Sequence, residues 1–166
     1  LDFESFSLVR ELGPANATQQ VWRITGNGDL RTVRVIPTLS ERINWLASSG
    51  IAGYQAGPDG HYLHLTGTQA RLVIESIPTG LDIAYVESAN GRISNFARLN
   101  NSMNFRFNAH VKGSLQLAHP PACKVFAADK RLKASKRRRT NSTLTSHSYQ
   151  IPLADARAGI LVSIRC

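Results

Sequence analysis

Apolar and polar residues alternate along several short stretches of the chain, which is the pattern of strands with one buried face. The clearest stretch is 104–111, where the apolar positions are Phe105, Phe107, Ala109 and Val111. Residues 159–165 alternate in the same way. Shorter runs that are typical of strands lie at 71–77, 81–87, 113–117 and 148–153. The pattern predicts a fold built mainly from antiparallel strands.

One stretch has a helical period instead. Its apolar positions are Leu39, Ile43 and Leu46. This spacing places them on one face of a helix. Thr38 and Glu41 have the spacing of an N-terminal capping box, and Gly50 is suited to end the helix. The sequence therefore predicts one short helix over about 39–48.

Turn sequences rich in glycine and asparagine separate these elements. GNGD at 26–29 predicts a hairpin between its flanking β-branched runs, and GPDG at 57–60 and ANGR at 89–92 predict further turns. The resulting order of strand, helix, strand, strand over about 30–66 resembles the N-terminal domains of secretins, which are modules of bacterial envelope assembly, and nucleic-acid-binding KH domains. A KH domain carries its G-x-x-G loop between two helices, whereas GPDG lies between two predicted strands.

The chain of 166 residues has the length of one domain that buries its own core. We expect an α+β fold, dominated by antiparallel strands with one short helix, in a single mixed or sandwich-like domain over 1–166. A weaker alternative divides the chain into 1–78, with the strand–helix–strand–strand order, and 79–166, all-β with a basic loop at 129–142. No stretch approaches the ~20 apolar residues of a transmembrane helix.

Positive charge is concentrated in one segment. Residues 124–139 hold eight Lys and Arg against Asp129, which accounts for seven of the nine net positive charges of the chain. Cations this dense repel one another unless an anion binds them. The candidate anion-binding residues are Lys130, Arg131, Lys133, Lys136, Arg137, Arg138 and Arg139. The alternative is a solvated loop that only keeps the protein soluble.

Few aromatic residues accompany these cations. Phe126 lies inside the segment and Tyr149 lies beyond it, so the bases of a single strand would find little to stack on. The composition favours a diffuse, salt-dependent contact with phosphate, sulfate or carboxylate groups. The expected partner is an acidic glycan, lipopolysaccharide, an acidic protein or another envelope subunit, and a nucleic-acid backbone is the alternative.

The two cysteines, Cys123 and Cys166, lie on either side of the basic segment. They have no CxxC spacing and are too few to form a structural zinc site alone. We expect a disulfide bond between them, which would close a loop of about 43 residues and stabilise the fold by roughly 3–4 kcal/mol. Such a bond predicts a periplasmic or extracellular location. Reduced, unrelated thiols in a cytoplasmic protein are the alternative.

The histidines are the only residues whose pattern suggests an enzymatic function. HLT at 64–66 and HSY at 147–149 resemble the paired H-x-[ST] motifs of 2H phosphoesterases, but Tyr149 stands where Ser or Thr is required. His110 and His119 could act as an acid–base pair in a basic ribonuclease. Neither arrangement is accompanied by a recognisable catalytic motif such as G-x-S-x-G or a Walker loop.

No metal or cofactor is expected. His61 and His64 are three residues apart in a predicted strand, so they point to opposite faces and do not share a metal ion. The leading hypothesis is a non-enzymatic exported binding or assembly module of a bacterial envelope or surface structure, whose basic loop contacts an anionic partner. The alternatives are an intracellular nucleic-acid-binding domain with reduced cysteines and, third, a small histidine-dependent hydrolase.

Overall fold

A computed structural model describes residues 6–11, 19–26, 32–35, 42–57, 60–75, 83–139 and 144–166. The chain divides into two compact units, Leu1–Leu81 and Asp82–Cys166. Antiparallel strands dominate both units, and the described residues contain one short helix, α1 (Leu153–Ala158). The predicted fold class is confirmed, while the assignment of 1–166 to one domain stays a prediction.

The first unit contains two groups of antiparallel strands. One has the order β1-β2-β7-β4, with bounds Phe6–Glu11, Gln19–Gly26, Gln69–Glu75 and Arg42–Ile43. The other has the order β3-β6-β5, with bounds Thr32–Val35, Gly60–Leu65 and Ile51–Gly57. β5 and β6 pair as a hairpin that ends with Gly57 opposite Gly60, which confirms the turn predicted from GPDG.

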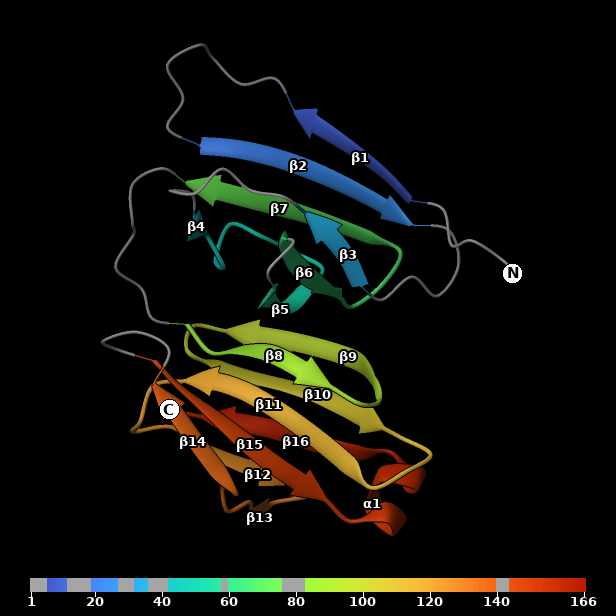
Figure 1. Ribbon diagram of the computed structural model, residues 1–166, viewed down its shortest axis with the longest axis vertical. Helices are drawn as coiled ribbons and strands as arrows, with labels where there is room; N and C mark the ends of the chain where they lie inside the picture. Colours follow the sequence, from blue (N-terminus) through green and yellow to red (C-terminus); the bar gives the residue numbers. More distant parts are fainter. Residues whose placement is uncertain are drawn as a thin grey trace. The chain divides into compact units, whose positions relative to one another are not determined.

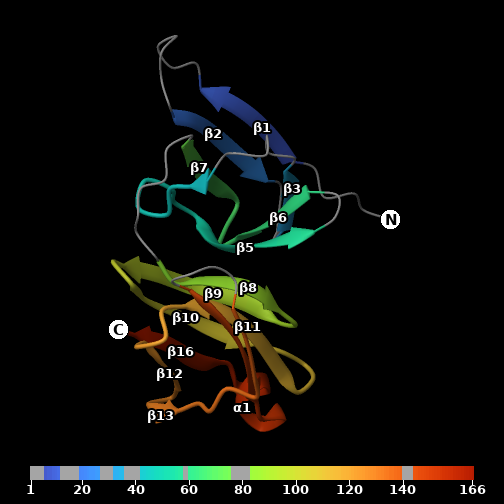
Figure 2. The ribbon, with the colours of Figure 1, turned by 60° about the vertical axis from the view of Figure 1, so that its left-hand side comes forward.

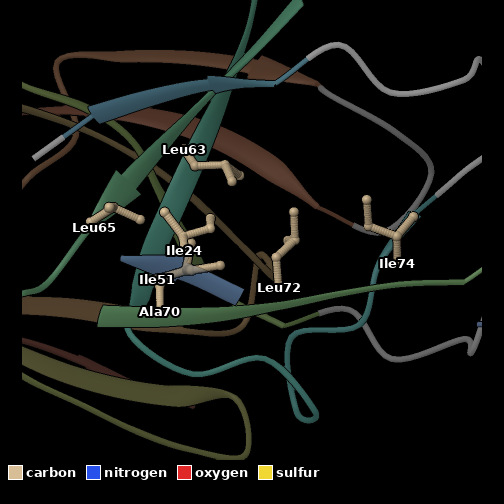
Figure 3. Packing of buried hydrophobic residues seen from close by; sticks show 7 residues of the cluster. All are labelled: Ile24, Ile51, Leu63, Leu65, Ala70, Leu72 and Ile74. Carbon is tan, nitrogen blue, oxygen red and sulfur yellow. The ribbon is translucent and has the colours of Figure 1, made fainter. Parts of the chain in front are cut away.

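Buried apolar side chains from both groups form the core of the first unit (Figure 3). Its buried members are Ile24, Ile51, Leu63, Leu65, Ala70, Leu72 and Ile74. Partly buried side chains pack against them, and these are Trp22, Ile43, Trp45 and Tyr54. Burial of each large apolar side chain stabilises the fold by about 1.5–3 kcal/mol relative to exposure, so this core holds the two groups of strands together.

The predicted helix at 39–48 is wrong over residues 42–48, and residues 39–41 lie outside the described part of the chain. Ile43 belongs to β4, which pairs with β7 at the edge of its sheet. Residues 42–66 therefore lack the helix on which the resemblance to secretin and KH domains rests.

Asn44 accounts for the difference. Its side-chain oxygen accepts hydrogen bonds from the backbone N–H groups of Leu46 and Ala47, at 3.1 and 3.0 Å. An asparagine that bonds its own backbone two and three residues on favours a turn over a helix. Leu46, expected on the apolar face of the helix, is 53% exposed.

The hairpin predicted across 26–29 is wrong as well. β2 is flanked on both sides, by β1 and β7, whereas β3 pairs with β6 in the other group of strands. Residues 27–31 lie outside the described part of the chain. Burial of the apolar face of each strand decides its partners, and a local turn sequence does not encode that choice.

The second unit contains two antiparallel sheets (Figure 1). In one, β14 (Lys136–Arg139), β15 (Thr145–Ile151), β11 (Gly113–His119) and β8 (Tyr85–Ala89) lie in this order. The other is five-stranded, with the order β13 (Lys130–Arg131), β12 (Lys124–Ala127), β16 (Ile160–Arg165), β10 (Ser102–Asn108) and β9 (Arg92–Leu99).

The buried faces of these two sheets pack against each other, so the second unit is sandwich-like (Figure 2). Phe107 of β10 is fully buried, and a Cβ atom at Gly113 of β11 would lie only 2.6 Å from its ring. Glycine at this position therefore permits the close approach of the two sheets. Ala109 is buried as the alternation predicts, but Val111 is exposed because β10 ends before it.

The sequence ANGR at 89–92 connects the two sheets instead of closing a hairpin. β8 before it pairs with β11, and β9 after it pairs with β10. The hairpin lies one strand later, between β9 and β10, where Leu99 pairs with Ser102. Asn100 in this turn has a φ of 51°, a backbone conformation that asparagine tolerates better than most residues.

Helix α1 forms where the sequence pattern indicates none. Pro152 precedes it, and Gly159, with a φ of 76°, ends it. Its alanine-rich sequence has high helix propensity, but six residues are too few to show a helical period. The backbone N–H of Ala109 donates a hydrogen bond to the carbonyl of Ala156 at 3.0 Å, which fixes the helix beside the end of β10.

Arg98 of β9 is a charged residue in a largely buried position. It lies opposite the buried Met103, and its guanidinium carbon is 5.0 Å from the centroid of the Phe96 ring. One guanidinium nitrogen donates a hydrogen bond to the carbonyl of Ala84 at 3.4 Å. Burial lowers the pKa of Arg98 to about 10, because desolvation disfavours the charged form.

We expect Arg98→Met to raise the free energy of unfolding of the second unit by about 1–3 kcal/mol, because methionine fills the site without the desolvation penalty of a charge. Arg92→Met is the control, since Arg92 is exposed on the same strand; its effect should stay within about 0.5 kcal/mol. Denaturant unfolding measures both variants. A loss of stability in Arg98→Met alone would show that the guanidinium makes a net favourable contribution, contrary to this prediction.

Candidate anion-binding site

Most of the basic segment, residues 124–139, lies in the strands β12, β13 and β14, although a loop was predicted at 129–142. β12 and β13 belong to the five-stranded sheet, and β14 belongs to the other sheet of the second unit. β13 and β14 each stand at the end of a strand order. Edge strands commonly carry charged residues, which oppose unwanted pairing, so a run of cations is compatible with a strand at these places. Residues 140–142 lie outside the described residues.

A tight turn at Ala128 and Asp129 connects β12 and β13 into a hairpin. Ala128 and Asp129 have φ angles of 43° and 63°, both in the left-handed region that a type I′ turn requires. The backbone N–H of Ala128 donates a hydrogen bond to the carbonyl of Leu161 at 2.9 Å, which fixes the turn against β16. Three candidate residues follow the turn and have exposed side chains, namely Lys130, Arg131 and Lys133.

Three cations share the outer face of the five-stranded sheet with Phe126, where β13, β12 and β16 lie side by side in this order (Figure 2). We call Lys124, Phe126, Arg131 and Arg165 the Phe126 cluster. Arg131 pairs with Phe126, and Lys124 pairs with Arg165. The guanidinium carbon of Arg165 lies 4.5 Å from the centroid of the Phe126 ring, within reach of a cation–π interaction.

The pairing of Lys124 with Arg165 places two positive charges directly opposite each other. Like charges in this arrangement destabilise a sheet. The neighbouring residues Val125 and Ile164 are buried, so alternation turns both cations to the outer face, where they are exposed. Asp129 supplies one negative charge, since its carboxylate lies 2.6 Å from a guanidinium nitrogen of Arg165.

The predicted disulfide bond between Cys123 and Cys166 is present, with the two Cα atoms 4.1 Å apart. Such a bond fits an oxidising compartment. Cys123 directly precedes Lys124, and Cys166 directly follows Arg165. The bond therefore holds together the end of the β12–β16 ladder at which the two cations face each other.

The remaining candidate residues are the four of β14, Lys136–Arg139. They pair with β15 in the other sheet, from Lys136 opposite Ser148 to Arg139 opposite Thr145. Backbone and side-chain groups of Ser135 donate hydrogen bonds to the carbonyl of Ser148, at 2.8 and 3.0 Å, where this pairing begins. The structure thus distributes the seven candidates over two edge strands and the connection between them.

The excess of positive charge lies wholly in the second unit. Residues 82–166 contain fourteen Lys and Arg against four Asp and Glu, whereas residues 1–81 contain six against seven. Lys124 and Arg165 contribute to this excess, although the sequence pattern did not single them out. The predicted disulfide bond nevertheless implies that Lys124 and Arg165 lie close together, because each is next to one of its two cysteines.

Two buried histidines of the second unit lie together, and they come from different predicted pairs. The rings of His119 and His147 stack with their centroids 4.2 Å apart. His119 Nδ1 lies 2.8 Å from the carbonyl oxygen of Pro120, which can only accept, so this nitrogen donates the hydrogen bond. Nε2 and the hydroxyl of Tyr149 form a second hydrogen bond at 2.8 Å. All three side chains are buried, which favours a structural role.

The two histidines of the predicted ribonuclease pair lie at opposite ends of one strand. His110 is exposed before β11, and His119 is buried at the far end of that strand. A strand of seven residues spans about 20 Å, so this pair does not meet. His64 lies in β6 of the first unit and His147 in β15 of the second.

Among the described residues, no three His, Cys, Asp or Glu side chains are placed to hold a metal ion. In the same part of the chain, no helix combines the length and apolarity needed to span a bilayer. No protein-family model, no curated protein and no solved structure matches this chain. Its function is therefore inferred from the site itself.

Proposed function

We propose that this chain is a non-enzymatic, exported binding or assembly module that contacts an anionic partner through the cations of its second unit. It would act in the periplasm or outside the cell, as part of a bacterial envelope or surface structure. The partner classes that suit it are an acidic glycan, lipopolysaccharide or an acidic protein subunit.

The proposal rests on the uneven distribution of charge between the two units. A basic excess confined to one unit attracts a polyanion to that unit and raises the rate of association. Exposed cations suited to such contact include Lys124, Lys130, Arg131, Lys133 and Arg165. The disulfide bond supports the exported location, because such bonds persist in oxidising compartments.

We expect the double variant Arg131→Ala/Lys133→Ala to bind heparin, a sulfated glycan, about thirtyfold more weakly than the unaltered chain, because each of the two lost contacts removes an attraction of about 1 kcal/mol. The slope of log affinity against log salt concentration should fall by about 2. Fluorescence anisotropy with labelled heparin, between about 50 and 200 mM salt, measures both quantities.

Arg92→Ala/Lys112→Ala is the matched control, since it removes one arginine and one lysine that are exposed outside the basic segment. An equal loss of affinity in the two double variants would mean that only net charge matters, and the basic segment would then have no special role. Absence of heparin binding by the unaltered chain at low salt would overturn binding to sulfated glycans altogether.

The same titration with double-stranded DNA distinguishes the exported module from the intracellular nucleic-acid-binding alternative. An exported module needs no preference for nucleic acid over a glycan of similar charge density. DNA binding much tighter than heparin binding, retained after the disulfide bond is reduced, would favour a nucleic-acid-binding protein instead.

A further inference from the structure

In the Phe126 cluster, the positive charges outnumber the negative charges that contact them. Lys124 and Arg165 face each other across β12 and β16, and Arg131 stands opposite Phe126 on the other side. Their side chains are exposed, so the three cations are accessible on the same outer face of neighbouring strands. The carboxylate of Asp129 contacts only one of them, Arg165, at 2.6 Å.

Three features make this place more specific than a diffuse basic surface. The disulfide bond directly beside Lys124 and Arg165 cross-links the strands that carry them. The Phe126 ring lies under the guanidinium of Arg165 and restricts its orientation. Two arginines, Arg131 and Arg165, supply planar groups that bind oxyanions through paired hydrogen bonds.

The contact with Asp129 determines which anion this cluster would prefer. A ligand that binds Arg165 in place of Asp129 must compensate for the lost contact between Arg165 and the Asp129 carboxylate. A ligand with a single carboxylate only exchanges one such contact for another, so it gains little binding free energy. A phosphate monoester carries about −1.5 to −2 charges at pH 7 and offers three acceptor oxygens, so it satisfies Arg165 and its neighbouring cations together.

We propose that the Phe126 cluster is a receptor for phosphate monoester groups, with Asp129 as an internal competitor that occupies Arg165 when no ligand is bound. The inference rests on the proposed function and names the chemical group that this part of the basic segment recognises. The group could be carried by a phosphorylated glycan or by a lipid headgroup, which share this chemistry.

Glucose 6-phosphate and glucuronate are a matched pair of probes, because both place an anion at the same position of a hexose. NMR titration of the isotope-labelled chain should show shifts at Lys124, Phe126, Arg131 and Arg165 with the phosphate probe, at affinity at least about fivefold higher than with glucuronate. The affinity of the phosphate probe should rise several-fold between pH 5 and 7.5, since its second ionisation lies near pH 6.

Asp129→Asn gives the sharpest test, because it removes the competitor and should raise the affinity for glucose 6-phosphate by about three- to tenfold. Asparagine tolerates the left-handed backbone of this turn, so the fold should be retained, which circular dichroism checks. Arg165→Lys should weaken binding at least about fivefold although it keeps the charge, because lysine lacks the planar fork of arginine. Lys112→Ala, outside the cluster, should change it less than about twofold.

Equal affinity for the two hexose probes, or no gain in Asp129→Asn, would overturn the phosphate receptor. If heparin still bound through Arg131 and Lys133 in that case, the broader proposal would stand while this inference failed. Vesicles containing phosphatidic acid, compared with glucose 6-phosphate, distinguish the sources: tighter binding to the vesicles assigns the group to a lipid, and tighter binding to the sugar assigns it to a glycan.

Discussion

Loss of the Cys123–Cys166 bond is expected to lower the free energy of unfolding of the second unit by about 4 kcal/mol. The cysteines are 43 residues apart in sequence, and closing a loop of this length in the unfolded chain removes that much conformational entropy on the chain-entropy model. The bond also opposes the repulsion between Lys124 and Arg165, which pair beside it, so reduction should loosen this end of the β12–β16 ladder first.

Denaturant unfolding of the Cys123→Ala/Cys166→Ala variant and of the reduced chain measures the loss. Both tryptophans, Trp22 and Trp45, belong to the first unit, so their fluorescence follows that unit and circular dichroism is needed to include the second. A reducing agent should have no effect on the double variant. A difference below about 1 kcal/mol would mean that the bond contributes little to the stability of the second unit.

Phe107→Ala should destabilise the second unit by about 3–5 kcal/mol, because it removes a fully buried ring and leaves a cavity. The ring lies where β10 meets Gly91 and Gly113, and Cβ atoms at those glycines would come within 2.8 and 2.6 Å of it. Both glycines therefore depend on the ring for their packing, and the backbone around them has little room to fill the space.

Val111→Ala is the matched comparison, since simple alternation places Val111 on the same face as Phe107. Val111 is 57% exposed, and its replacement should change the stability by less than about 0.5 kcal/mol. Thermal or denaturant unfolding followed by circular dichroism measures both. Similar losses in the two variants would contradict the end of β10 at Asn108.

Strands were predictable from the sequence wherever one face is buried, because alternation records burial directly. The stretch around Phe105 and the last strand are examples, and both form as predicted. Strand partners were not predictable to the same degree. The turns at 26–29 and 89–92 look like hairpins, yet the strands on either side of each pair elsewhere, because pairing depends on contacts distant in sequence.

The two errors about helices have a local cause. Three apolar residues with helical spacing indicated a helix near Ile43, but the hydrogen bonds of Asn44 and the neighbouring strand β7 stabilise a strand and turn there. Helix α1 is shorter than two turns and is fixed by its contact with β10 through Ala156. So short a helix depends on tertiary packing more than on propensity.

The sequence indicates which charged residues and cysteines belong to the candidate site, but not how strand pairing arranges them. Charge density alone identified the cations of 130–139, and cysteine position identified the disulfide bond. The Phe126 cluster required the pairing of β12 with β16, which brings Arg165 to residues about forty positions earlier. The contact of Asp129 with Arg165 also depends on that pairing.

The edge position of β14 has a consequence for how copies of this chain meet. An exposed strand edge is a template for pairing with another strand, but every residue of β14 is Lys or Arg. Direct pairing of two such edges would bring together four Lys or Arg residues from each chain, so like charges oppose this pairing. If the proposed anionic partner is a long polymer, it would neutralise these charges and lower the repulsion, so binding of the polymer would promote pairing between copies.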